Sequence, residues 1–329
     1  MVPSPLFLER LEKVKKTVHS ENDTVTTCYM GSATPAAHMK VSMAKFANDP
    51  DVNINTTLKY INEINSIAPI DCLNMGAGGM KINVILTGMW LSKIKMPGKE
   101  LPEESLWQVD EKKVLLEEDY DLVINEGLNA LKGKILPQVI EMSELQEFQE
   151  YMQKNAQKNA LLVIENDYPS VNAAASSPPF EMLCGARSMS QFFMDCYKMP
   201  DKIEAAINAM LPDIIESMVQ TVKQAQGMGT WVGGWRGASA MVSPKIWDKL
   251  VWPSMYQMGM ACIENDITPT FHLDQNWDRD IERFLELPAK KCIINTDGMT
   301  DLRNLRKKLG THCAIMGDAP PQLLATGSP

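Results

Sequence analysis

The chain has 329 residues, 45% of them apolar, and a formal net charge of -9. This size and composition are sufficient for a large globular core, whereas the negative charge, with no stripe of lysine and arginine among aromatic residues, argues against nucleic acid as a partner. The seven cysteines are scattered and include no C-x-x-C pair, which favours a reducing compartment over a disulfide framework or a zinc knuckle.

The amino-terminal segment, MVPSPLFLERLEKVKKTV, mixes charged side chains with apolar ones at helical spacing. It therefore predicts a surface helix rather than a signal peptide. No window approaches the roughly 18 consecutive apolar residues of a membrane-spanning helix. We expect a soluble, cytoplasmic protein that does not contact a membrane.

Short strand-like runs alternate with helical stretches along most of the chain, as expected when β/α units build a parallel sheet. The candidate strands are 25–30, 70–75, 82–87, 160–164, 230–234, 268–272, 292–296 and 314–317. Helices are expected at 200–226, where apolar residues recur every three or four positions, and at 244–265, where Ser243 and the following proline form a typical helix start.

Two segments lack any periodicity. Residues 96–110 and 166–179 are rich in proline, serine and acidic residues, which predicts long loops. We find no internal repeat and no linker-like tract. The simplest organisation is one domain over residues 1–329, with a helical segment at its amino end.

Three strand-like runs end in an acidic residue: TPTFHLD at Asp274, CIINTD at Asp297 and CAIMGD at Asp318. The carboxyl ends of parallel strands meet at one edge of a sheet, where enzymes of this architecture place their active sites. His272 and Asp274 are two residues apart, so they would share one face of a continuing strand. An imidazole beside a carboxylate suits a divalent metal, or a general acid with its orienting partner. The structural alternative is a His–Asp hydrogen bond that only organises a loop.

Two ligands do not complete a catalytic zinc site, which uses about three protein groups and an open position. Asp297, Asp318 and Glu165, the last of which follows the run LLVI, are candidates for a further ligand or a base. Each has a structural alternative, because aspartate before glycine or proline is ordinary turn chemistry and Glu165 is equally consistent with a cap.

The segment WVGGWRG would place Trp235 and Arg236 at another strand end, where they could line a substrate cavity. Core packing of the tryptophan and an ion pair of the arginine with a carboxylate are the alternatives. The segment GAGG at 76–79 also follows a strand. Because the next residues, MKINVILTGMW, predict a further strand, the strand–glycine–helix order of a dinucleotide site is not expected there.

Three longer segments carry a resemblance to a known family. SPPFEMLCGARSMSQFFMDCYKMPDKIEAAI, LVWPSMYQMGMACIENDITPTFHLDQN and AIMGDAPPQLLATGSP resemble segments of the uroporphyrinogen decarboxylase superfamily, which includes porphyrinogen decarboxylases and corrinoid-dependent methyltransferases. The resemblance implies an α/β fold, a (β/α)8 TIM-type barrel, with the last strand and helix apparently missing from this chain.

Departures from the family patterns favour one branch. Decarboxylases of this family carry an arginine-bearing segment near the amino end that holds the substrate carboxylates, and the comparable residues here, YMGSAT at 29–34, contain no arginine. The methyltransferase branch binds zinc through a His-x-Cys and a later cysteine. This chain has His272-x-Asp274 instead, and the third position would fall beyond Pro329.

The resemblance therefore implies a methyltransferase that moves a methyl group between a small O- or N-methyl donor and a corrinoid protein. His272 and Asp274 would hold zinc with Glu165 or Asp318, while Trp235, Arg236 and Asp297 would contact the donor. A homodimer is possible. Two alternatives stay open: a metal-free porphyrinogen decarboxylase, and a protein that binds a corrinoid or tetrapyrrole without turnover.

Overall fold

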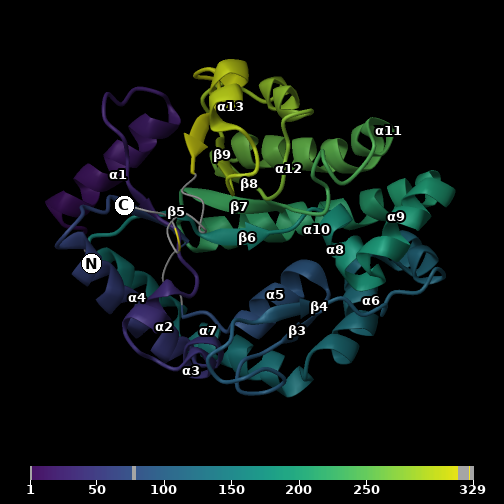
Figure 1. Ribbon diagram of the computed structural model, residues 1–329, viewed down its shortest axis with the longest axis horizontal. Helices are drawn as coiled ribbons and strands as arrows, with labels where there is room; N and C mark the ends of the chain where they lie inside the picture. Colours follow the sequence, from purple (N-terminus) through teal and green to yellow (C-terminus); the bar gives the residue numbers. More distant parts are fainter. Residues whose placement is uncertain (1, 76–78, 318–325, 327–329) are drawn as a thin grey trace.

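A computed structural model describes residues 2–75, 79–317 and 326, and parallel strands with helices around them form its centre (Figure 1). One sheet has the order β1 (Cys28–Tyr29), β2 (Cys72–Met75), β5 (Ser170–Asn172). The other has the order β6 (Ala174–Ser176), β7 (Gly229–Gly234), β8 (Thr268–Leu273), β9 (Ile293–Thr296), β10 (Ala314–Met316). Every pairing within these two sheets is parallel, which confirms the α/β class.

The two sheets are adjacent and nearly continuous. Only Ala173 separates β5 from β6, and its N–H donates to the carbonyl of Gly229 at the start of β7. Within the described ranges, β10 and β1 are the two edge strands, so the ring of strands is open between them.

Helices precede the first strand and connect the later ones. They are α1 (Pro5–Val18), α2 (Thr34–His38), α3 (Met43–Asn48), α4 (Pro50–Asn65), α5 (Ile82–Trp90), α6 (Asp119–Val139), α7 (Met142–Glu165), α8 (Pro179–Arg187), α9 (Met189–Lys198), α10 (Pro200–Gln224), α11 (Pro244–Ile246), α12 (Trp252–Glu264) and α13 (Leu302–Leu309). A π-helical turn (Trp247–Val251), a 3-10 helix (Ile281–Glu286) and an antiparallel hairpin of β3 (Lys93–Lys95) and β4 (Gln108–Asp110) complete the described elements.

The helix expected at 200–226 is confirmed as α10. Its apolar stripe, including Ile203, Ile207 and Met210, is buried in the main hydrophobic core, which also contains Val232 of β7 and Phe271 of β8. This packing explains the periodicity, because a helix with one apolar face is stable only when that face is covered.

The helix expected at 244–265 is also confirmed, with one interruption. Ser243 caps its start by accepting a hydrogen bond from the N–H of Ile246. Residues 247–251 then form a π-helical turn, which ends two residues before Pro253. Proline has no N–H and its ring crowds the carbonyl four residues earlier, and a wider turn at this point relieves that conflict.

The amino-terminal helix is α1, and it covers the amino ends of the strands (Figure 1). Val14 and Val18 pack against a layer of small apolar side chains from β2, β5, β9 and β10. The hydroxyl of Ser4 caps the helix by accepting from the N–H of Phe7. Within the described residues, no helix combines the length and apolarity needed to cross a membrane.

Two predicted strands are wrong. Residues 82–87 belong to helix α5, and residues 160–164 form the end of helix α7. A short apolar run does not reveal whether it is a buried strand or a buried helix. The glycine segment 76–79 therefore does lie between a strand and a helix, against the expectation, although Gly76–Gly78 fall outside the described residues. Segment 166–179 is not wholly a loop, because it contains β5 and β6, and β4 lies within 96–110.

Glycine 185 marks the closest approach between α8 and the end of α5. A Cβ atom there would lie 2.0 Å from the carbonyl oxygen of Trp90, whereas a Cβ at Gly133 in α6 would meet nothing within 4 Å. We predict that Gly185→Ala lowers the free energy of unfolding by about 1–3 kcal/mol through overpacking. Gly133→Ala should raise it by about 0.5–1 kcal/mol, since alanine is the better helix residue. Urea denaturation measures both, and equal effects would contradict the packing described.

Candidate active site

His272 lies at the carboxyl end of β8, inside the edge where the parallel strands end, and is 9% exposed. It pairs in register with Gly233 of β7 and Asn295 of β9. Position 233 has no room for a side chain, because a Cβ there would lie 2.6 Å from the ring of Trp231. That ring lies beside the imidazole instead, with the two centroids 5.0 Å apart.

Both nitrogens of the His272 ring face an acceptor. Nε2 lies 3.0 Å from a carboxylate oxygen of Asp274, and Nδ1 lies 2.6 Å from Oδ1 of Asn295. The amide of Asn295 is oriented by its own Nδ2, which donates to the carbonyl of Met316. Because an acceptor can be satisfied only by an N–H, this arrangement favours the doubly protonated imidazolium.

The pKa of His272 is raised above its ordinary value. Burial alone would lower the pKa, since desolvation disfavours the charged ring, but the hydrogen bond and charge of Asp274 outweigh it, and Asn295 and Asp297 add to the increase. The side chain of Asp274 is 37% exposed, so the pair reaches from the buried sheet edge to the surface. His272 and Asp274 thus meet as their spacing predicts.

The expected metal site is not completed by the described residues. Catalytic zinc uses about three protein ligands, and in the described part of the chain no group of three histidine, cysteine, aspartate or glutamate side chains could hold a metal ion. Glu165 does not end a strand: it is the last residue of α7, five positions before β5 begins, and so lies toward the opposite end of the parallel strands from His272. Asp318 lies outside the described residues.

Asp297 organises the loops next to His272. One of its oxygens accepts from the N–H of Gln275 and the other from the N–H of Met299. These two hydrogen bonds are the turn contacts that the sequence offered as the structural alternative for Asp297. They hold the loop that follows β8 against the end of β9, while direct contact of Asp297 with a substrate stays a prediction.

Trp235 and Arg236 follow β7 and form a cluster with Trp90. The Arg236 side chain is fully buried, and its guanidinium lies 4.2 Å from the Trp235 ring centroid. It forms ion pairs with Glu181 at 3.7 Å and with Glu111 at 3.5 Å. The arginine therefore meets carboxylates of its own chain, and its role toward a substrate stays a prediction, as does that of the half-buried Trp235.

Glu181 is a buried carboxylate to which sequence reasoning gave no role. Its two oxygens accept from the backbone N–H groups of Trp235, Arg236 and Gly237, at 2.9, 3.0 and 2.9 Å. It fixes the loop that carries the tryptophan. An acidic residue inside the apolar run PPFEMLCGA is a signal that could have identified it.

Asparagines at strand ends form a second group that sequence reasoning missed. Asn74 of β2 accepts a hydrogen bond of 2.8 Å from Asn172 of β5, and both side chains are buried. Oδ1 of Asn172 and the hydroxyl of Thr270 find no hydrogen-bond partner among the described residues. Such groups are normally satisfied by water or a ligand. The signal is one asparagine in each apolar run, as in CLNM, SVN and IINT.

Residues 171–329 match the family model described as uroporphyrinogen decarboxylase (URO-D). The match covers just under half of the chain and supports the resemblance of its sequence motifs to the uroporphyrinogen decarboxylase superfamily. Among solved structures it is similar to a methyltransferase from Methanosarcina mazei, with a TM-score of 0.62 and 10% identity over 93% of this chain and 81% of that chain. This likeness confirms the barrel fold. No curated protein matches the chain.

The charge of His272 gives a pH-dependent contribution to stability. Because folding raises its pKa, this contribution is fully present below the unfolded value of about 6.5 and is lost as the pH rises through the folded pKa. We predict that Asp274→Asn lowers the pKa of His272 and removes the contribution, as measured by NMR titration of the imidazole and by denaturation at several pH values. Asp297→Asn should have a smaller effect, and an unchanged pKa in Asp274→Asn would contradict the pairing.

The Glu181 carboxylate should contribute more to stability than Glu111, although both pair with Arg236. Glu181→Gln turns an amide N–H₂ toward backbone N–H groups or the guanidinium, and we predict a loss of about 1–3 kcal/mol in the free energy of unfolding. Glu111→Gln removes a partner whose side chain is 31% exposed, and should cost less than about 1 kcal/mol. Urea denaturation measures both losses, and a larger loss for Glu111→Gln than for Glu181→Gln would contradict the role described for Glu181.

Proposed function

We propose that this protein is a methyltransferase that takes a methyl group from a small O- or N-methyl donor and passes it to a corrinoid carried by a partner protein. The observation that supports the proposal is the His272–Asp274 pair, a buried acid that opens to the surface where the parallel strands end. The match of residues 171–329 to the uroporphyrinogen decarboxylase model, and the resemblance to a superfamily that includes corrinoid-dependent methyltransferases, support this reaction class.

Removing a methyl group from an oxygen or nitrogen requires help for the departing atom, which keeps the electron pair of the broken bond. The corrinoid supplies the cobalt(I) nucleophile that accepts the methyl group. His272 supplies a proton: its Nε2–H is held at 3.0 Å by the half-exposed Asp274 carboxylate, and a donor atom that binds beside this carboxylate would take the proton from Nε2 as its bond to the methyl group breaks. Asn295 keeps the ring in place during this transfer. A positioned acid of this kind contributes about 10²–10⁴-fold in rate.

Tryptophan rings suit the donor pocket. Trp231 lies against the imidazole, and Trp235 and Trp90 meet edge to face with their centroids 5.9 Å apart. All three are half-buried. Flat rings exclude water from the departing atom and accept either an aromatic ether or a methylated ammonium group.

Zinc stays a prediction. The described residues offer two ligands, His272 and Asp274, and the chemistry above uses these side chains without a metal. Metal analysis of the purified protein tests the expectation independently. One zinc per chain that disappears in both His272→Ala and Asp274→Asn would replace the proton transfer with Lewis-acid assistance by zinc.

Porphyrinogen decarboxylation is the second candidate, because the matching family model carries that description. A substrate with several carboxylates needs guanidinium groups that are free to bind them. The charge of Arg236 is balanced by Glu111 and Glu181 at 3.5 and 3.7 Å. Its guanidinium nitrogens form no hydrogen bond within the described residues, but a single guanidinium does not hold several carboxylates, which disfavours this activity. Incubation with uroporphyrinogen tests it, and formation of coproporphyrinogen would establish it.

We predict that the protein, mixed with cob(I)alamin and a panel of methylated compounds, changes the cobalamin absorbance with at least one donor. His272→Ala should lower this rate by about 10²–10⁴-fold. His38→Ala is the matched control, because among the described residues that exposed histidine contacts Glu63 and the Tyr60 ring, away from His272. Activity should also fall as the pH rises through the folded pKa of His272, since the acid is then lost.

Equal rates for wild type and His272→Ala would contradict the proposed role of the imidazole. Tight retention of a corrinoid or tetrapyrrole, with no product from any donor, would instead support a binding protein without turnover.

A further inference from the structure

The chain turns sharply at Gln275, directly after the His272–Asp274 pair. The φ angle of Gln275 is 69°, in the left-handed region that a residue with a side chain rarely adopts. Such strain persists only where the surrounding structure enforces it, and it is found mostly at functional sites. Because Gln275 follows Asp274, whose carboxylate lies 3.0 Å from Nε2 of His272, the conformation of this turn bears on the pair itself.

The peptide groups of Gln275 are held by the loop that follows β9. Its N–H donates to a carboxylate oxygen of Asp297 at 2.9 Å, and its carbonyl accepts from the hydroxyl of Thr300 at 3.1 Å. The same hydroxyl accepts from the backbone N–H of Trp277 at 3.0 Å. Thr300 is 1% exposed, so a single buried oxygen joins both sides of the turn and enforces its left-handed conformation.

The backbone of Asp274 is fixed on both sides as well. Its N–H donates to the carbonyl of Gly234 at 2.8 Å, and its carbonyl accepts from the indole N–H of the buried Trp277 at 2.7 Å. The carboxylate itself is 37% exposed, and exposed ion pairs usually contribute little because both side chains lose conformational freedom. An ordered backbone reduces that loss, so Asp274 keeps its carboxylate on His272.

We propose that Thr300 is a positioning residue of the candidate active site: together with Asp297, its hydroxyl holds Gln275 in the conformation that keeps the Asp274 carboxylate on His272. Thr300 acts through the backbone of residues 274–277 and not by contact with a substrate. The inference rests on the proposed function, in which His272 is the acid. If the turn relaxed, the imidazole would lose the group that orients its Nε2–H.

Two substitutions of Thr300 test the role of its hydroxyl. Thr300→Val keeps the shape of the side chain but can neither donate nor accept, whereas Thr300→Ser retains the hydroxyl. The readout is the downfield proton signal of the His272 Nε2–H at one fixed pH, in protein labelled with nitrogen-15 histidine and assigned with His272→Gln. The signal should be present in the wild type and in Thr300→Ser, and it should be lost to exchange with water in Thr300→Val.

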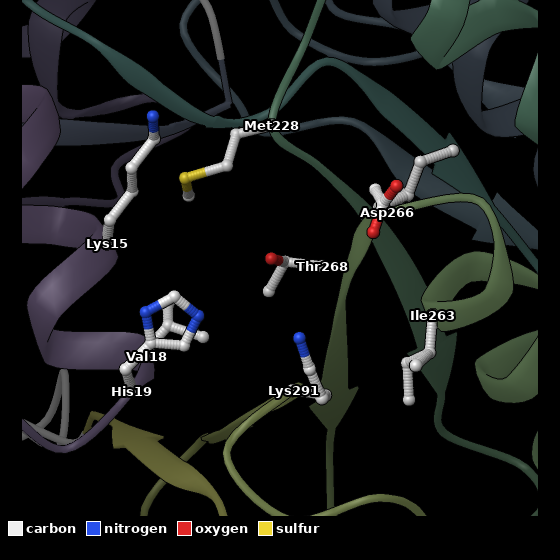
Figure 2. A pocket seen from close by; sticks show the side chains of 9 residues that line it. Lys15, Val18, His19, Met228, Ile263, Asp266, Thr268 and Lys291 are labelled. Atoms are coloured by element: carbon white, nitrogen blue, oxygen red, sulfur yellow. The ribbon is translucent and has the colours of Figure 1, made fainter.

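Substitutions of Gln275 separate the turn from general destabilisation. Gln275→Gly should restore the signal in Thr300→Val, because glycine adopts a positive φ unaided, and Gln275→Val alone should lose it, because a β-branched residue disfavours that region. Lys290→Val is the matched control. Lys290 also has a positive φ of 62°, but it precedes Lys291, which lines a hollow at the amino ends of the strands, away from His272 (Figure 2). This control should keep the signal.

Kinetics give a second readout. Thr300→Val should lower kcat for methyl transfer by about 10–10²-fold while KM changes less than about threefold, because a misplaced acid slows the chemical step and not donor binding. The spectroscopic readout needs no turnover, so a protein that is inactive with every donor contradicts the proposed function, and the Nε2–H signal alone then decides the role of Thr300. The role is overturned if Thr300→Val keeps the signal, if Thr300→Ser loses it equally, or if Lys290→Val also loses it.

Discussion

The candidate site depends on the parallel register of β7, β8 and β9, which places Gly233, His272 and Asn295 side by side. Strand side chains alternate between faces, so a slip of one residue would move His272 to the helix-covered side of the sheet. Glycine at 233 protects this arrangement, because the Trp231 ring occupies the space that a side chain there would need. The register of these three strands therefore places His272 beside both its acceptor Asn295 and the ring of Trp231.

The buried charged side chains of the candidate site are paired with side chains of opposite charge from the same chain. His272 lies between Asp274 and Asn295, and Glu181 satisfies three consecutive backbone N–H groups while it pairs with Arg236. A buried charge is costly unless it is paired and hydrogen-bonded. The partners found here keep the imidazole charged and the Trp235 loop in place, so the site is organised before a substrate arrives.

The sequence predicted the parts that follow a simple period. The runs at 268–272 and 292–296 form strands, and the two-residue spacing of His272 and Asp274 does bring their side chains together. The strand predicted at 82–87 is wrong because an apolar, β-branched run is compatible with either a strand or a buried helix. The role of Glu181 could not be predicted, since its three partners lie more than 50 positions away in the chain, and only the folded structure brings them together.

The most direct test of the account is a crystal structure of the protein with a non-transferable analogue of an active donor, such as its trifluoromethyl counterpart. We predict that the analogue lies among Trp231, Trp235 and Asp274, with the leaving-group atom within hydrogen-bond reach of Nε2 of His272. An analogue bound away from His272, or a metal ion between it and the imidazole, would contradict proton transfer from this residue.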